Sequence, residues 1–138
     1  MSNRIKVGAI AFGLLAVVAP GRADDADPRK LEAQMEKLLA AYNKDDVKAF
    51  FQNWASTVKS ITTDMTYDAL YKNGAKKTCG DYKPKTLKFR KDGSVLTGDY
   101  LVVYFEAQFS KEKEGVIAVN FAKEGNEYKF MQVQMQKK

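Results

Sequence analysis

The sequence contains no histidine, and this absence excludes more functions than any residue that is present. Without histidine there is no Ser-His-Asp triad, no His-based metal site and no imidazole to exchange protons near neutral pH. A single cysteine likewise excludes an internal disulfide, a zinc cluster and an iron–sulfur centre. The chain also has no Gly-rich phosphate loop and no clustered loop carboxylates, so we expect neither a cofactor nor a metal site.

Long hydrophobic runs are scarce too. The longest, over residues 7–19, is shorter than the roughly 20 residues of a membrane-spanning helix. Arg4 and Lys6 precede this run, and small residues follow it at the positions that a signal peptidase prefers. The layout predicts a secretory signal peptide over residues 1–23 and one mature domain over residues 24–138; an uncleaved N-terminal anchor is the alternative. We therefore expect an exported protein, periplasmic or extracellular in a bacterium, without a stable membrane anchor after cleavage.

The excess of positive charge is small once this leader is removed. The full chain has 23 Lys+Arg and 17 Asp+Glu, a net charge of +6. Three basic residues and no acidic ones lie in residues 1–23, so the predicted mature domain carries only +3. The remaining basic clusters are short pairs, and we expect no nucleic-acid partner. A hydrophobic content of 45% indicates a single globular domain with a buried core.

The first half of this domain has the periodicity of helices. Asp27 and Pro28 are suited to the N-cap and first turn of a helix whose apolar stripe is Leu31, Met35, Leu38, Leu39 and Tyr42. A second stripe predicts a helix over Val47, Phe50, Phe51, Trp54 and Val58. A third, weaker helix is expected to start at Thr62 or Thr63, to bury Tyr67, Leu70 and Tyr71, and to end at Gly74. Residues 76–84 are expected to form a loop.

After Pro84 the period changes from 3.6 to 2, which predicts strands. Four segments are expected, near residues 84–91, 99–110, 115–123 and 127–137, and their short connections favour an antiparallel meander. One register is consistently apolar and should face the helices. Its members are Leu87, Phe89, Leu101, Val103, Phe105, Ala107, Phe109, Ile117, Val119, Phe121, Met131, Val133 and Met135.

The opposite face of this predicted sheet is also partly apolar. It would carry Tyr100, Val102, Tyr104 and Phe130 among polar residues. An exposed apolar patch often marks an interface, so these four residues are candidates for contacts in a homodimer or with another protein. The alternative is that they are separate exposed residues with good strand propensity.

The order of elements and one short motif resemble a known superfamily. Residues 42–46, Tyr-Asn-Lys-Asp-Asp, resemble the corner between the first two helices of nuclear-transport-factor-2-like (SnoaL-like, cystatin-like) domains, and residues 47–54 resemble the helix that follows. The closer resemblance is to small exported bacterial domains of unknown function. It implies an α+β fold with N-terminal helices packed on a curved, cone-like antiparallel sheet of four or more strands. Catalytic members of the superfamily usually place Asp and His in the cone, and no catalytic residue can be transferred to a chain without histidine.

Aromatic residues suggest where a ligand would bind. Trp54, Tyr67 and Tyr71, with Phe105 from the sheet, could line a pocket between helices and sheet that accepts a small apolar ligand. The alternative is that these residues are ordinary core, because aromatic residues at helical spacing usually are.

No candidate for catalysis is as well supported. Glu106 belongs to the polar register of its strand and is better explained as a solvated side chain. Cys79 lies in a predicted loop without a neighbouring base; it could form an intermolecular disulfide or sense oxidants, or have no role. The sequence therefore favours an exported, non-catalytic module for ligand binding or protein interaction. A minimal isomerase or cyclase that uses Tyr with Asp or Glu, and a structural or inhibitory subunit of an envelope complex, are the alternatives.

Overall fold

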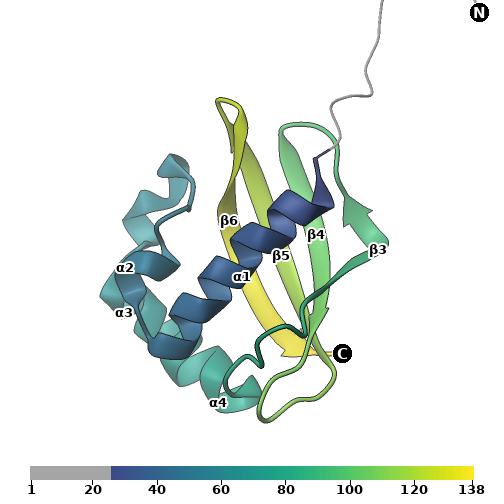
Figure 1. The fold of residues 1–138 in the computed structure, drawn as a ribbon. Helices are drawn as coiled ribbons and strands as arrows, with labels where there is room; N and C mark the ends of the chain where they lie inside the picture. The colour runs from purple at the N-terminus through teal and green to yellow at the C-terminus, as the bar shows by residue number, and fades with distance from the viewer. Residues whose placement is uncertain (1–25) are drawn as a thin grey trace, which may run out of the picture.

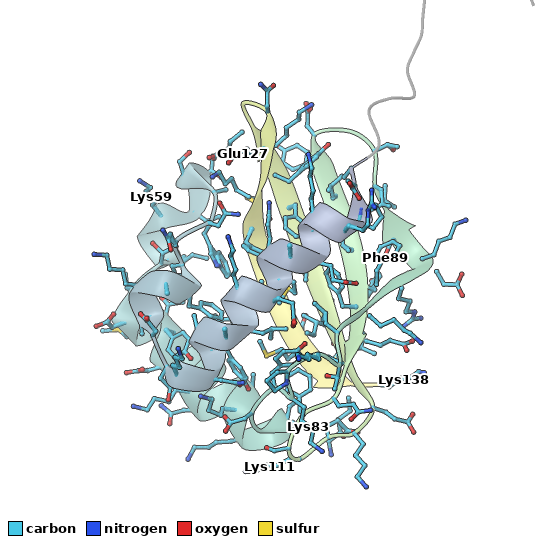
Figure 2. All side chains as sticks on the ribbon, in the orientation of Figure 1. Lys59, Lys83, Phe89, Lys111, Glu127 and Lys138 are labelled. Atoms are coloured by element: carbon cyan, nitrogen blue, oxygen red, sulfur yellow. The ribbon has the colours of Figure 1, made fainter. Side chains whose placement is uncertain are left out.

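The computed structural model describes residues 26–138, so the predicted signal peptide and its cleavage site lie outside the described residues. The helices come first and a four-stranded antiparallel sheet follows, which is the expected α+β class. A long helix crosses one face of the sheet, and the shorter helices lie beside its last strand (Figure 1). Side chains fill the space between the long helix and the sheet (Figure 2). No helix among residues 26–138 has the length and apolarity needed to cross a membrane.

Helix α1 (Pro28–Lys44) confirms the first predicted helix. The Asp27 carboxylate accepts a hydrogen bond of 2.9 Å from the Arg29 backbone N–H, and Pro28 occupies the first turn, where its missing N–H is not needed. The chain leaves the helix at Asp45, which has a left-handed backbone with φ 53°. All five residues of the predicted stripe are buried against the core: Leu31, Met35, Leu38, Leu39 and Tyr42.

The second predicted helix is much shorter than expected. Helix α2 spans only Val47–Phe50, and the backbone of residues 53–55 then pairs in parallel with the last strand. The Ala55 N–H donates to the Phe130 carbonyl at 2.8 Å, and the Phe130 N–H donates to the Asn53 carbonyl at 3.0 Å. These bonds replace the helical bonds that the sequence pattern favours, because a tertiary pairing overrides a local propensity. The 3₁₀ helix η2 (Ser56–Ile61) follows.

The third helical segment is longer than predicted and includes a π-helix. It begins at the Thr63 cap as α3 (Asp64–Tyr67), continues as the π-helix η3 (Asp68–Ala75) and ends as α4 (Lys76–Cys79). The prediction that Gly74 ends this helix and that a loop begins at residue 76 is wrong. Gly80 ends it instead, with φ 86° and no room for a side chain, since a Cβ there would lie 2.0 Å from the Ser110 hydroxyl.

The sheet confirms the meander and most of the predicted register. Strands β3 (Lys88–Val95), β4 (Tyr100–Ala107), β5 (Gly115–Glu124) and β6 (Glu127–Lys137) lie side by side in sequence order, each antiparallel to the next. The first strand runs four residues further than expected, because it passes through Asp92-Gly93 with a register irregularity between Arg90 and Val95. The buried face of the sheet includes Leu101, Val103, Phe105, Ile117, Val119 and Phe121.

A bulge in β6 corrects the predicted position of Phe130. Phe121 pairs with Phe130, but Asn120 pairs with Gln132, so Met131 is an extra residue in the strand. The extra residue reverses the alternation, and Phe130 therefore points into the core with 1% of its surface exposed. Its ring centroid lies 4.9 Å from that of Phe121. The assignment of Phe130 to the outer face was wrong.

Candidate binding sites

Three of the four predicted pocket residues come together around one phenylalanine. Trp54, Tyr67 and Tyr71 surround Phe50 of α2, with ring centroids 5.9, 5.0 and 4.6 Å from it. Tyr67 is fully buried in this cluster, whereas Trp54 and Tyr71 also reach a groove on the surface. Phe105 is fully buried elsewhere, on the sheet face, with its ring 6.3 Å from that of Phe89. Of the four predicted pocket residues, Tyr67 and Phe105 therefore belong to the core, whereas Trp54 and Tyr71 line the groove.

This groove, which we call the β6 groove, runs between strand β6 and the helical segment 56–79. Its volume is about 600 Å³, within the range of roughly 300–1,000 Å³ that is typical of ligand sites. One wall is β6 from Met131 to Lys137, and the other includes Trp54, Leu70 and Tyr71. Lys137 is the one charged side chain among the described residues that line the groove, so its surface is largely neutral.

Strand β6 presents its free edge to this groove, since it is the last strand in the sheet order. The bonds to residues 53–55 cover the edge at Phe130, and the Tyr71 hydroxyl donates a 2.7 Å bond to the Val133 carbonyl. Burial raises the pKa of Tyr71 well above its usual range, so this hydroxyl keeps its proton. Because backbone direction alternates along a strand, Met135 and Lys137 direct their N–H and C=O groups to the same side as Val133.

Exposed apolar side chains gather beside the groove. Ile61 and Leu70 line it with 42% and 55% of their surfaces exposed, and Met65, on the same helical segment, is 81% exposed. Leu70 was predicted to be buried. The other exposed large apolar residues of the described chain, Val95 and Tyr100, belong to the β3–β4 hairpin at the opposite side of the sheet (Figure 1).

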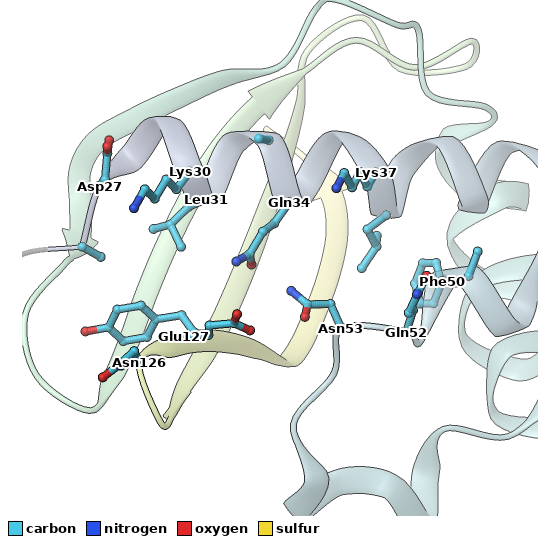
Figure 3. Close-up of a pocket in the computed structure, with 15 residues that line it drawn as sticks. Asp27, Lys30, Leu31, Gln34, Lys37, Phe50, Gln52, Asn53, Asn126 and Glu127 are labelled. Carbon is cyan, nitrogen blue, oxygen red and sulfur yellow. The ribbon is translucent and has the colours of Figure 1, made fainter.

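A second cavity, which we call the polar cleft, opens between α1, the segment Ala49–Asn53 and the β5–β6 turn, and has a volume of about 730 Å³ (Figure 3). Buried apolar side chains of Leu31, Leu38 and Phe50 line part of it. The remaining lining is mostly polar, and it includes four carboxamide side chains from three parts of the chain: Gln34, Gln52, Asn53 and Asn126. Sequence reasoning missed this site, because isolated carboxamides far apart in the chain form no motif.

The most connected group of titratable residues joins α1 to the helical segment 64–79. The Asp45 carboxylate accepts hydrogen bonds from the Tyr67 hydroxyl at 2.8 Å and the Lys76 ammonium at 2.9 Å. Lys76 also donates to the Tyr42 carbonyl at 2.7 Å. Desolvation acts to raise the pKa of Asp45, but the bonds from Lys76 and Tyr67 outweigh it and hold that pKa below its usual range. Both bonds are accepted by the Oδ1 atom of Asp45, and they connect the end of α1 to the helical segment 64–79.

A similar contact joins α1 to the loop before β3. The Tyr82 hydroxyl donates to the Glu36 carboxylate and accepts from the Leu87 N–H. Burial and the neighbouring Glu36 charge raise the pKa of Tyr82 to about 12. Its hydroxyl therefore stays protonated and remains a hydrogen-bond donor throughout the physiological pH range.

Apart from Phe130, the residues proposed for an interface lie, together with Glu106, along the outer face of β4. Tyr100 is 72% exposed at the start of β4, whereas Val102 and Tyr104 are half-buried on the outer face. The Arg90 guanidinium lies 5.7 Å from the Tyr104 ring centroid. Glu106, on the same face, pairs with the Lys138 ammonium at 3.7 Å.

Cys79 is the last residue of α4, not part of a loop, and it is fully buried. Burial raises the pKa of its thiol, with a smaller effect of the Glu112 carboxylate. A buried thiol with a raised pKa has little of the thiolate form that reacts with oxidants or disulfides.

Among residues 26–138, no three Cys, Asp or Glu side chains gather as ligands for a metal ion. Comparisons with family models, curated proteins and solved structures gave no match to the chain. The two cavities therefore have to be interpreted from their own chemistry.

Proposed function

We propose that this chain is an exported, non-catalytic binding module that takes a ligand with an apolar body into the β6 groove. The observation that carries the proposal is the position of Ile61 and Leu70, two exposed apolar side chains that flank Trp54 and Tyr71 in one groove. Exposed apolar groups that gather in a concave site are typical of a binding surface. Export rests on the leader-like pattern of residues 1–23.

The lining also indicates the polar end of such a ligand. Carboxylate side chains are not among the described residues that line the groove, and Lys137 supplies a positive charge at the end of β6. An apolar body with a neutral or anionic head therefore fits better than a cationic amphiphile, whose charge Lys137 would repel.

Membership of the nuclear-transport-factor-2-like superfamily is also part of this proposal. It is supported by the element order, in which helices precede a four-stranded antiparallel meander, and by the corner at residues 42–46, where α1 ends and the chain enters α2. Members of a superfamily this diverse share no single activity, so the groove and not the fold carries the functional proposal.

The single tryptophan gives a direct test, because Trp54 lines the groove. Anilinonaphthalene sulfonate, which has an apolar body and one anionic group, should bind and accept excitation energy from Trp54. Leu70→Glu places a carboxylate in the groove and should weaken binding by roughly tenfold or more. Val95→Glu is the matched control, since Val95 is 50% exposed on the far hairpin, and it should leave the affinity unchanged. Equal affinities in both variants and the parent protein would exclude the β6 groove as the site.

A homodimer through the outer face of the sheet is a second candidate, and the 72% exposure of Tyr100 favours it. Val102→Glu or Tyr104→Glu would place a carboxylate in such an interface and should convert a native dimer into monomers in sedimentation velocity. A dimer that persists in both variants would exclude this face.

A further inference from the structure

We propose that the β6 groove binds an extended peptide segment of another protein, which adds a strand to the free edge of β6. In this mode of recognition, backbone hydrogen bonds hold the peptide and alternate side chains occupy the groove. The ligand class named here rests on the function proposed above, because the groove is the same. Strand pairing and the binding of an apolar ligand can still be tested separately.

Two hydrogen bonds show which backbone groups of β6 face the groove. The Val133 carbonyl accepts from the Tyr71 hydroxyl on the groove side, whereas the Lys138 N–H donates away from it, to the carbonyl that precedes β5. Because backbone direction alternates along a strand, the N–H and C=O groups of Met135 and Lys137 face the groove. Within the part of the chain that the structure describes, these backbone groups have no hydrogen-bond partner. They can therefore pair with another strand.

The two edges of the sheet differ in how they are protected. Edge strands of natural proteins usually carry charges, proline or irregularities that prevent another strand from pairing with them. The opposite edge, β3, has an irregular register and the charged residues Lys88, Arg90, Lys91 and Asp92. In contrast, residues 130–136 of β6, Phe-Met-Gln-Val-Gln-Met-Gln, contain no charged residue, proline or glycine. The edge of β6 is therefore suited to accept a strand, and the edge of β3 is not.

The chain itself already covers the beginning of this edge. Residues 53–55 pair with Phe130, and the bulge at Met131 follows directly. Over residues 132–137 the strand pairs with β5 without a further irregularity, so this part of its edge is regular. A peptide in the groove would continue, along the same edge, the pairing that residues 53–55 begin.

The other wall of the groove decides the kind of partner. The helical segment 56–79 lies beside β6 (Figure 1), and the groove of about 600 Å³ lies between the two. A strand that pairs with β6 would lie about 4.8 Å from it, within this groove. A second copy of the protein would bring its own helical segment to the same edge, where the first copy's segment already lies. A single peptide segment therefore fits the groove better than a contact between two β6 strands.

The alternation of the strand predicts the sequence pattern of a suitable peptide. Antiparallel pairing is slightly more stable per residue than parallel pairing, and residues opposite one another share a face of the sheet. Peptide residues opposite Val133 and Met135 would point towards the core and should be apolar, because these two side chains are buried. Residues opposite Gln134 and Gln136 would face solvent and can be polar. An acidic residue opposite Lys137 would pair with the charge that this residue brings to the groove.

The test uses the peptide Glu-Thr-Val-Thr-Val-Thr, which has this pattern, with fluorescein at its carboxyl end. Fluorescence anisotropy should show saturable binding to the mature protein below millimolar concentration. In the antiparallel register the valine N–H groups face β6, so N-methylation of both valines should weaken binding by roughly tenfold or more. N-methylation of the first two threonines is the matched control. It adds the same number of methyl groups to the opposite edge of the peptide and should leave the affinity unchanged.

Two variants of one residue test the same contact from the side of the protein. Lys137→Pro removes an N–H that would bond to the peptide, and proline is tolerated on an edge strand where the N–H faces outward. Lys137→Thr removes the same charge but keeps the N–H, so it is the matched control. Lys137→Pro should bind the peptide roughly fivefold more weakly than Lys137→Thr, whereas anilinonaphthalene sulfonate should bind both variants equally.

Amide hydrogen exchange locates the peptide on the strand. In the parent protein, bound peptide should slow exchange at Met135, whose N–H faces the groove, and not at Gln134, whose N–H faces β5. The proposal is overturned if the dye binds and the peptide does not, if the two methylated peptides bind equally, or if exchange at Met135 is unchanged. Each of these outcomes leaves the function proposed above intact. Loss of both dye and peptide binding would instead exclude the β6 groove itself, and a dimer that the peptide dissociates would assign the edge to a second copy and overturn the proposal.

Discussion

Asp45 is the residue on which the contact between α1 and the following helices depends. Its left-handed backbone ends α1, and its carboxylate receives Tyr67 and Lys76. Asparagine tolerates the same backbone conformation, so Asp45→Asn removes the charge without adding strain. The side chain is 36% exposed, and we expect the variant to lose about 1–2 kcal/mol of stability at neutral pH.

The pH dependence of stability has a definite sign here. A carboxyl group whose pKa is lowered by folding stabilises the protein above its unfolded pKa, about 3.9 for aspartate, and loses that effect as pH falls through the lower folded value. Urea unfolding from neutral pH to below pH 4 should therefore show a smaller loss of stability in Asp45→Asn than in the parent protein. Identical acid limbs would show that Asp45 is not held by these bonds.

Cys79 gives a second prediction for a single residue. Because the thiol is buried and its pKa is raised, Ellman's reagent should leave the native protein unmodified and react fully after unfolding in urea. Non-reducing electrophoresis of the native protein should accordingly show no disulfide-linked dimer. Rapid native modification would mean that the end of α4 opens readily.

The helices and strands differ in how closely they follow the pattern of their own sequence. The α1 stripe and the inner positions of β4 and β5 were predicted correctly, because local periodicity and burial agree in those elements. The helix predicted from Val47 to Val58 is cut short because residues 53–55 bond to Phe130 of β6, which lies more than 70 positions away in the chain. A bulge such as that at Met131 is also invisible to a count of alternating residues.

The β6 bulge can be tested by comparing two residues that were assigned to the same face. Phe130→Ala should cost about 3–5 kcal/mol of stability, because a buried ring is replaced by a cavity. Tyr100→Ala should change stability by only about 0.5 kcal/mol, since Tyr100 is largely exposed. Similar small losses in chemical denaturation would place Phe130 outside the core and contradict the bulge.

Phe50 lies between the two cavities. It lines the polar cleft, and its ring packs against Trp54 and Tyr71, which line the β6 groove. Two of the four aromatic residues proposed from the sequence, Trp54 and Tyr71, line one of these cavities, but the sequence could not show that distant carboxamides would meet at the other. Both cavities depend on tertiary packing that no single segment encodes.

This shared wall leads to a prediction for the intact protein. Phe50→Leu keeps an apolar core but removes the ring that supports Trp54 and Tyr71, and it should weaken binding of the dye in the β6 groove. Parallel dye titrations of the parent and the variant would check this; an unchanged affinity in Phe50→Leu would show that the ring does not support the groove.

The π-helix η3 has a consequence for how the length of this chain can vary between related sequences. Removing one residue from an ordinary α-helix turns everything beyond the deletion by about 100° around the axis. A π-helix holds a surplus residue in its wider turn, so a deletion within residues 68–75 can be absorbed by reverting to α-helical bonds. Homologous sequences one residue shorter between Thr63 and Gly80 should therefore keep Cys79 and Gly80 in place, while the surface offered by Leu70 changes. Gains and losses of single residues at this point would change the wall of the β6 groove while keeping the two ends of the segment in place.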